Sequence, residues 1–330
     1  PGQGDDFYRM NGGGEMLVFS AADFEDFLEP RPDLAASMEA ELERVVRLLA
    51  EQRWPFRLHA TYDESITRFL DVFERIDRDV PFNGLRWFFD HAETITPRNI
   101  ERVMALGGGI AIQHRMAFQG EYFVERYGAR AAETTPPIRR MLAMGLPVGA
   151  ETDATRVASH NPWVVLRWLV TGRTVGGLSL YPAANRLDRT TALRLYTQGS
   201  AWFSGEDHSK GAIAPGQFAD LTVLSADYFS VPETEIGDIV SMLTIVGGKP
   251  VHGTGEFKDL APPLPPASPD WTPVNHYGGQ RRAAAIDLPP VLARGCGVHR
   301  HAHAAAHPAP VQSADIAGFW GALGCSCFAF

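Results

Sequence analysis

The chain has 330 residues, of which 45% are hydrophobic and 21% are charged, and its formal net charge is −9. These proportions allow a sizeable buried core and argue against disorder throughout. The acidic balance argues against a nucleic-acid-binding surface. No window approaches the roughly 20 consecutive apolar residues that a membrane-spanning helix needs. We therefore expect a soluble protein of one or two domains.

The cysteines and the first residue bear on compartment and completeness. Cys296, Cys325 and Cys327 are the three cysteines, and they are too few and too clustered for a disulfide framework. They leave the redox compartment undetermined, so a cytoplasmic location is only the default expectation. The chain begins at Pro1 without an initiator methionine or a leader pattern, and we expect a larger upstream portion to precede it.

The first two thirds of the chain alternate short apolar runs with amphipathic segments. The apolar runs, which we expect to be strands, cover residues 16–19, 55–59, 85–91, 110–114 and 146–150. Apolar residues that recur every three or four positions predict helices over roughly 34–52, 66–76, 97–106, 136–144 and 162–170. Regular alternation with near-continuous apolar strands favours a parallel α/β sheet or a (β/α) barrel.

Three connecting segments carry further expectations. Gly107, Gly108 and Gly109 follow a helix and precede a strand, the reverse of the order in phosphate-binding loops, so we expect them to end the helix and turn the chain. Residues 115–135, which contain several aromatic side chains, are expected to form a loop that either offers an aromatic lining to a substrate or is only packed against the body. Asp188 is expected to cap a last helix.

The character of the sequence changes after Gly205. Short β runs bounded by glycine and proline cover residues 219–224, 240–246 and 250–252. A Pro-rich stretch and a His/Ala-rich stretch follow and are typical of a linker and of low complexity. The predicted domains are therefore a part-barrel over 1–205, a small β-sandwich portion over 206–258, and a linker with a C-terminal tail over 259–330.

Four predicted strands end in residues that can bind a metal or transfer a proton. These residues are His59, His91, His114 and, three positions beyond the last strand, Asp153. Because the carboxyl ends of barrel strands meet at one face, we expect the four side chains to lie close together. A lone strand-end histidine is more often structural, but three in succession with an aspartate favour a functional cluster. Imidazoles with one carboxylate suit zinc and similar divalent ions.

Other polar residues give weaker signals. Arg156 follows on the same loop and is a candidate to pair with an anionic substrate group. His160 precedes a helix and is either a substrate contact or part of the helix cap. The histidines of the tail lie among alanines and prolines that supply no rigid geometry for a metal.

Several motifs resemble the metal-dependent amidohydrolase superfamily. Residues 56–63, 89–93 and 149–153 are similar to its strand-five histidine, strand-six histidine and strand-eight aspartate motifs. Residues 210–224 are the most specific match and resemble the signature G-x-I-x-P-G-x-x-A-D, where the chain leaves the barrel and enters a small β-sandwich. Together the motifs cover about 15–255 and indicate the amidohydrolase 3 (YtcJ-like) branch.

The resemblance implies a distorted TIM-like (β/α) barrel, of which this chain holds roughly strands 4–8. It implies His59 and His91 as metal ligands, and Asp153 as both a ligand and a proton shuttle. The first-strand His-x-His pair of the family has no counterpart before His59, as expected if the first three strands are missing. Residues 17–19 offer no metal-bridging lysine for the fourth strand, so one zinc ion is expected rather than two.

Further roles follow from the same resemblance. His114 is expected to contact the substrate or to polarise its oxyanion, while Arg156 and His160 stay candidate substrate contacts on the ground of their positions after the last strand. The three acids next to the ligand strands are expected to orient the ligand imidazoles: Asp63, Asp90 and Glu93. Surface or capping roles are equally good explanations for Asp63 and Glu93.

The implied activity is metal-dependent hydrolysis of a non-peptide carbon–nitrogen bond in a small amide or N-acyl compound. A metal-activated water would attack, and Asp153 would act as general base and then as general acid. Two alternatives stay open. One is a non-catalytic remnant of the fold, poorly stable because of its open sheet edges. The other is a hydrolase of an ester, lactone or phosphoester. The substrate and any homo-oligomer are not determined by the sequence.

Overall fold

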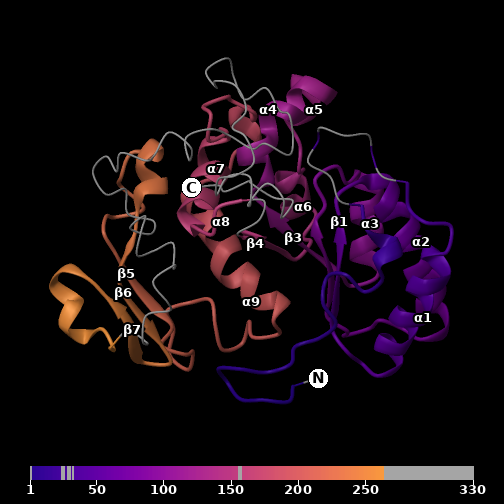
Figure 1. Cartoon of the computed structure of the whole chain (residues 1–330), viewed down its shortest axis with the longest axis horizontal. Helices are drawn as coiled ribbons and strands as arrows, with labels where there is room; N and C mark the ends of the chain where they lie inside the picture. The colour runs from indigo at the N-terminus through magenta and orange to yellow at the C-terminus, as the bar shows by residue number, and fades with distance from the viewer. Residues whose placement is uncertain (1, 24–26, 28–30, 32, 155–157, 264–330) are drawn as a thin grey trace, which may run out of the picture. The chain divides into compact units, whose positions relative to one another are not determined.

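The computed structural model describes residues 2–23, 27, 31, 33–154 and 158–263 (Figure 1). Its contacts divide the chain into two compact units, and each is described by itself. The first unit comprises Pro1–Thr152 and Asn161–Ala261, and the second comprises Asp153–His160 and Pro262–Phe330. Within the described residues, every helix and strand belongs to the first unit.

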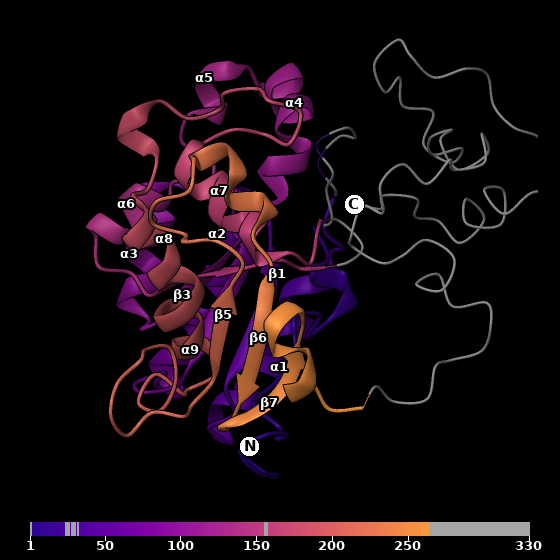
Figure 2. The same ribbon diagram turned by 90° about the vertical axis from the view of Figure 1, so that its left-hand side faces the viewer.

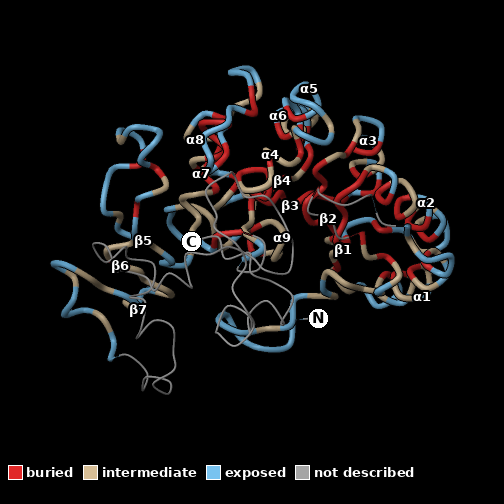
Figure 3. The backbone as a smooth tube through the Cα atoms, turned by 45° about the horizontal axis from the view of Figure 1, so that its top comes forward, coloured by how far each residue is buried: buried red, intermediate tan, exposed pale blue. Residues whose placement is uncertain are grey.

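A parallel sheet carries the first part of this unit. Its four strands lie in the order β1-β2-β3-β4 and are β1 Phe56–Ala60, β2 Trp87–His91, β3 Gly109–Gln113 and β4 Val148–Glu151. Most of their residues are buried, as Figure 3 shows. Near-continuous burial is typical of parallel sheets that are covered on both faces.

The edge of β1 is covered by the residues that precede the first helix. Gly13 forms a parallel bridge with Phe56, and the amides of Arg57 and His59 donate to the carbonyls of Gly13 and Glu15. The strand predicted over residues 16–19 is therefore wrong: residues 16–18 pair with no strand, and a 3-10 turn, Phe19–Ala21, follows. The backbone approaches most closely at Gly12, where a Cβ would lie 2.1 Å from the carbonyl oxygen of Pro55.

Three helices follow in the first half of the chain: α1 Met38–Glu51, α2 Asp63–Asp79 and α3 Pro97–Ala105. Helix α2 meets the sheet through an aromatic cluster, Phe56, Phe73, Phe82, Trp87 and Phe89. The ring centroids of Phe73 and Trp87 lie 5.1 Å apart, edge to face, and those of Phe73 and Phe89 lie 5.8 Å apart, stacked. This dry cluster fixes β1 and β2 against α2.

The remaining helices cover the second half of the unit. They are α4 Arg115–Tyr127, α5 Ala129–Ala132, α6 Ile138–Ala143, α7 Pro162–Thr171, α8 Arg189–Arg194 and α9 Ser200–Phe203, with a π-helical turn, Leu195–Gly199, between the last two. The loop predicted over 115–135 is wrong, because α4 buries Phe123 and continues into α5. The predicted cap is confirmed, since Asp188 accepts a hydrogen bond of 2.9 Å from the amide of Thr191. None of the helices in the described part of the chain is long and apolar enough to cross a bilayer.

A small antiparallel sheet follows, in the order β5-β6-β7 (Figure 2). Its strands are β5 Leu221–Leu224, β6 Ser241–Val246 and β7 Lys249–Gly253, with 3-10 turns at Ala183–Asn185, Glu233–Asp238 and Gly255–Leu260 around them. Gly247 and Gly248, with φ of 55° and 78°, make the tight turn between β6 and β7. The predicted β runs are confirmed.

The predicted α/β class is thus confirmed by a parallel sheet with intervening helices and a small antiparallel sheet. The predicted strands 55–59, 85–91, 110–114 and 146–150 correspond to β1 to β4. The domain boundary near residue 205 stays a prediction. Residues 264–330, which make up nearly all of the predicted linker and tail, lie outside the described residues.

Truncating the aromatic cluster should destabilise the chain. Phe73→Ala removes a fully buried ring and should lower the free energy of unfolding by about 3–5 kcal/mol. Leu48→Ala on α1, where the side chain is 57% exposed, should change it by less than about 0.5 kcal/mol. Urea denaturation followed by circular dichroism measures both, and equal losses would contradict the assigned packing.

Candidate metal centre

The polar face of the sheet follows from strand alternation. In β1, Phe56 packs against the aromatic cluster, so His59 and Arg57 point to the opposite face. His59 lies beside Asp90 in the register of β1 and β2. The Nε atom of Arg57 lies 3.5 Å from Oδ2 of Asp90, so the same face carries both charges.

His91 reaches this face only because the backbone departs from the alternation. Phe89 packs toward the helices, so a regular strand would send His91 the same way. Instead, His91 and Ala92 have left-handed φ angles of 76° and 54°. A left-handed backbone conformation costs a non-glycine residue roughly 1–2 kcal/mol. As a result, the rings of His59 and His91 lie 4.6 Å apart. Backbone strain of this kind is typically found at functional sites.

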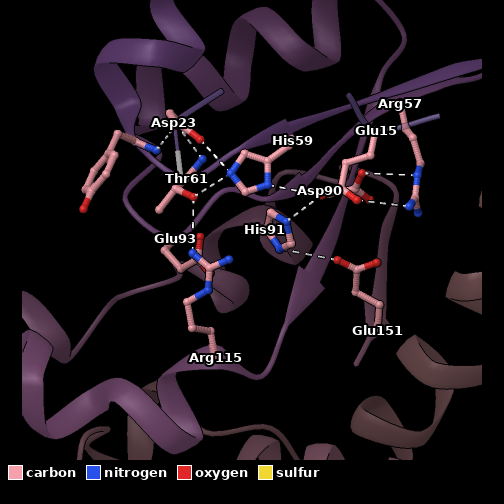
Figure 4. Close-up of polar contacts among 11 residues, drawn as sticks. Glu15, Asp23, Arg57, His59, Thr61, Asp90, His91, Glu93, Arg115 and Glu151 are labelled. Atoms are coloured by element: carbon pink, nitrogen blue, oxygen red, sulfur yellow. Dashed lines mark hydrogen bonds and ion pairs between the residues drawn. The ribbon is translucent and has the colours of Figure 1, made fainter. Parts of the chain in front are cut away.

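A carboxylate lies between the two imidazoles (Figure 4). Oε1 of Glu15 is 3.1 Å from Nδ1 of His59 and 3.1 Å from Nε2 of His91. Its other oxygen accepts a hydrogen bond of 3.3 Å from Nη2 of Arg57. Glu15, His59 and His91, called the Glu-His-His group below, have ligand atoms within 4.8 Å of one another.

The donor set of the Glu-His-His group fits a divalent metal ion. Two imidazole nitrogens and one carboxylate oxygen are the ligands of catalytic zinc sites that keep a position open. His59 and His91 are 2% and 1% exposed, whereas the side chain of Glu15 is 25% exposed. The group is therefore buried on the histidine side and reachable on the carboxylate side.

The charges of the group are coupled. Hydrogen bonds from His59 and then His91 hold the pKa of Glu15 well below its usual range. Burial lowers the pKa of His91 to about 3 against the effect of Glu15. Burial also acts to lower the pKa of His59, but the contacts with Asp23 and Glu15 outweigh it and raise the pKa to about 9. In the metal-free protein at pH 7, the group thus holds a carboxylate, an imidazolium and a neutral imidazole.

Each imidazole has a second acidic neighbour. Nε2 of His59 lies 2.8 Å from Oδ1 of Asp23, which is fully buried. Nδ1 of His91 lies 3.6 Å from Oε1 of Glu151 at the end of β4, which is beyond hydrogen-bond distance. Asp23 is therefore the closer of the two outer partners.

The strand-end residues predicted from the sequence separate in the structure. His59 and His91 come together, although their role as ligands stays a prediction. His114 is fully buried at the start of α4, where its ring contacts that of Phe118, and it is not part of the Glu-His-His group. His114 takes this position because the residues that follow it form helix α4, not the predicted loop.

Three further predicted residues lie on the segment after β4. Asp153 is exposed, has a left-handed φ of 48°, and belongs to the second unit, as does the exposed His160. Arg156 lies outside the described residues. The roles predicted for these residues stay predictions.

The three acids predicted to orient imidazoles have other partners. Asp63 accepts hydrogen bonds from the amide of Thr96 and the side chain of Asn99, at 2.7 and 2.8 Å, and so ties α2 to α3. The carboxylate of Glu93 lies 3.6 Å from Nε of Arg115.

Burial raises the pKa of Glu93. The charge of Glu93 also interacts with that of His59, and the imidazole-orienting roles predicted for Asp63 and Glu93 stay predictions. Asp90 lies in the register beside His59 and close to Arg57.

Sequence reasoning missed Glu15 and Asp23. Glu15 directly precedes the apolar run that was predicted as a strand, and pairing of glycines with β1 shifted the true edge to residues 13–15. A carboxylate at the end of that edge was the available signal. Asp23 lies in an acidic loop in which no pattern separates it from its neighbours.

Metal binding should release a proton from His59. Because a metal needs its Nδ1 deprotonated and its pKa is about 9, about one proton per ion should leave at pH 7, and affinity should rise about tenfold per pH unit up to about pH 9. Calorimetric titration with zinc in buffers of different ionisation enthalpy measures the release. His59→Ala is the control for ions held elsewhere, and equal release from both proteins would contradict the assignment.

Comparisons with known proteins give the chain its family. A family model described as the amidohydrolase family matches residues 1–252. The protein YtcJ of Bacillus subtilis (strain 168), named as an amidohydrolase, is 26% identical over 215 residues, which are 64% of this chain and 40% of YtcJ. N-substituted formamide deformylase of Arthrobacter pascens is 26% identical over 193 residues, 58% of this chain and 35% of that enzyme.

A solved structure is similar as well. The crystal structure of an uncharacterised metal-dependent hydrolase from Pyrococcus horikoshii OT3 matches with a TM-score of 0.51 and 26% identity, over 59% of this chain and 39% of that one. The matches thus span well under half the length of these relatives. Because the family model covers more than half of its residues, the chain belongs to the amidohydrolase family.

Proposed function

We propose that this chain contributes the metal centre of a metal-dependent hydrolase, in which Glu15, His59 and His91 hold one zinc ion. The observation that carries the proposal is the position of Oε1 of Glu15, 3.1 Å from a nitrogen of each imidazole. The similar structure from Pyrococcus is named as a metal-dependent hydrolase, which supports the same class.

When bound, such an ion lowers the pKa of water and polarises a carbonyl oxygen. The residues of the chain supply the rest. The carboxylate of Glu15 would offset the charge of the ion, and Arg57 holds the second oxygen of Glu15 so that the first faces the imidazoles. Burial keeps His91 neutral and ready as a ligand.

Asp153 completes the proposal on the strength of the sequence. It would accept a proton from water and deliver it to the leaving nitrogen. The support is the similarity of residues 149–153 to the strand-eight motif of the family. His114, Arg156 and His160 are kept as proposed substrate contacts because of their positions in the sequence after predicted strands.

The proposed substrate is a small molecule with a non-peptide carbon–nitrogen bond, as in an amide or N-acyl compound. The name of the Arthrobacter relative points to such a bond in N-substituted formamides. An ester or lactone is cleaved by the same kind of centre, so a substrate panel has to include these bonds as competitors.

Loss of the Glu15 carboxylate charge should weaken zinc binding. Glu15→Gln removes an anionic ligand and should raise the zinc Kd by at least about 10–100-fold, because even outer partners of a metal site are worth this much. Competition with a chromogenic chelator measures the Kd. Glu101→Gln, at an exposed position of α3, is the matched control. If both variants bind zinc like the original chain, the Glu-His-His group is not the metal site.

Removal of the Asp153 carboxylate should lower turnover while leaving zinc binding nearly unchanged. Asp153→Asn should lower kcat by at least about 10²-fold, the usual contribution of a positioned general base, with little change in zinc content. Turnover of a panel of N-formyl, N-acyl and ester compounds, measured with zinc per chain, tests this. Unchanged kcat would remove Asp153 from the mechanism, and a zinc-loaded chain that turns over no compound would favour the non-catalytic remnant.

A further inference from the structure

Asp23 is a buried carboxylate that has a close contact at each of its two oxygens. Its Oδ2 accepts hydrogen bonds from the amides of Thr61 and Tyr62, at 2.9 and 3.1 Å, in the loop that leaves β1. Its Oδ1 lies 2.8 Å from Nε2 of His59. Figure 4 marks this contact with a dashed line. The side chain is fully buried. The two amides fix the carboxylate, so its other oxygen is held beside one nitrogen of one imidazole.

The two nitrogens of His59 face different groups. Nδ1 faces Oε1 of Glu15 within the Glu-His-His group, and Nε2 faces Asp23. A neutral imidazole carries its proton on one nitrogen and offers the other to a metal. A carboxylate accepts but does not donate, so Asp23 favours the proton on Nε2 and leaves Nδ1 for the ion.

We propose that Asp23 is a positioning residue that selects the tautomer of His59 and so directs Nδ1 to the metal. This inference rests on the proposed metal centre. Thr61 is a competing neighbour among the described residues, since its Oγ1 is hydrogen-bonded to the same Nε2 at 3.4 Å, but it is farther away than Asp23 and also accepts a hydrogen bond from Arg115. Asp23 is thus the closer acceptor.

Replacing Asp23 by asparagine should reverse the preference of the His59 ring proton for Nε2. The amides of Thr61 and Tyr62 both need an oxygen, so the carbonyl of the new side chain takes the place of Oδ2. Its NH2 group then faces Nε2 and donates to it, which moves the ring proton to Nδ1, the atom the metal needs. Alanine, in contrast, deprives the two amides of their acceptor but leaves Thr61 free to accept from Nε2.

The test therefore compares zinc affinity with stability. At a pH where the ring of His59 is neutral in all the proteins compared, Asp23→Asn should raise the zinc Kd about 10–100-fold, while Asp23→Ala should raise it less and lower the urea midpoint more. The matched control is Asp63→Asn, in which the carboxylate also accepts from a loop amide but contacts no imidazole within the described residues. Its zinc Kd should stay within about twofold of the original, the scatter expected of a change that leaves the site intact.

If Asp23 only stabilised the fold, Asp23→Ala would weaken zinc binding at least as much as Asp23→Asn. If Asp23→Ala weakens zinc binding as much as Asp23→Asn, or if Asp23→Asn binds zinc like the original chain, the inference is overturned. The ring-nitrogen NMR signals of His59 give a second readout that does not depend on the variants. In the zinc-loaded chain they should show the proton on Nε2 and the metal on Nδ1, and the reverse arrangement also overturns it.

The metal-free chain separates this inference from the proposed function. Where the ring of His59 is neutral, its proton should lie on Nε2 in the original chain and on Nδ1 in Asp23→Asn. If zinc fails to bind but this shift occurs, the proposed metal centre is wrong and the tautomer selection by Asp23 stands. If zinc binds at the Glu-His-His group without the shift, the proposed centre stands and Asp23 is only structural.

Discussion

The contact of one carboxylate oxygen with two imidazoles is the interaction on which the site depends. Oε1 of Glu15 can lie 3.1 Å from both His59 and His91 only if both rings reach the same face of the sheet. Alternation along β1 places His59 there, whereas His91 needs a left-handed backbone at the end of β2. The strained backbone at His91 is thus needed to bring the two imidazoles to Glu15, and the surrounding structure must be rigid enough to maintain it.

The surroundings are rigid on both sides of the sheet. On the helix side, the aromatic cluster around Phe73 locks β1 and β2 to α2. On the polar side, Arg57 links Glu15 to Asp90, and Asp23 contacts the outer nitrogen of His59 while accepting from two loop amides. Glu15 and His59 therefore each have a partner that limits their rotation, a feature of preorganised metal sites.

The sequence allowed part of this to be predicted. Apolar periodicity located β1 to β4 and most of the helices, and histidines at strand ends led to His59 and His91. It did not lead to Glu15, because the edge of the sheet pairs through glycines that leave no apolar pattern. It did not lead to Asp23 either, because the contact with His59 joins residues far apart in the chain. The left-handed turn at His91 has no local signal, since neither His91 nor Ala92 is a glycine.

Anomalous diffraction at the zinc edge, from crystals of the zinc-loaded chain, would locate the bound ion. We expect a peak bonded to Oε1 of Glu15, Nδ1 of His59 and Nε2 of His91, at about 2.0–2.2 Å from each. A peak held by other histidines of the chain, with the Glu-His-His group left as a carboxylate hydrogen-bonded to two imidazoles, would contradict it.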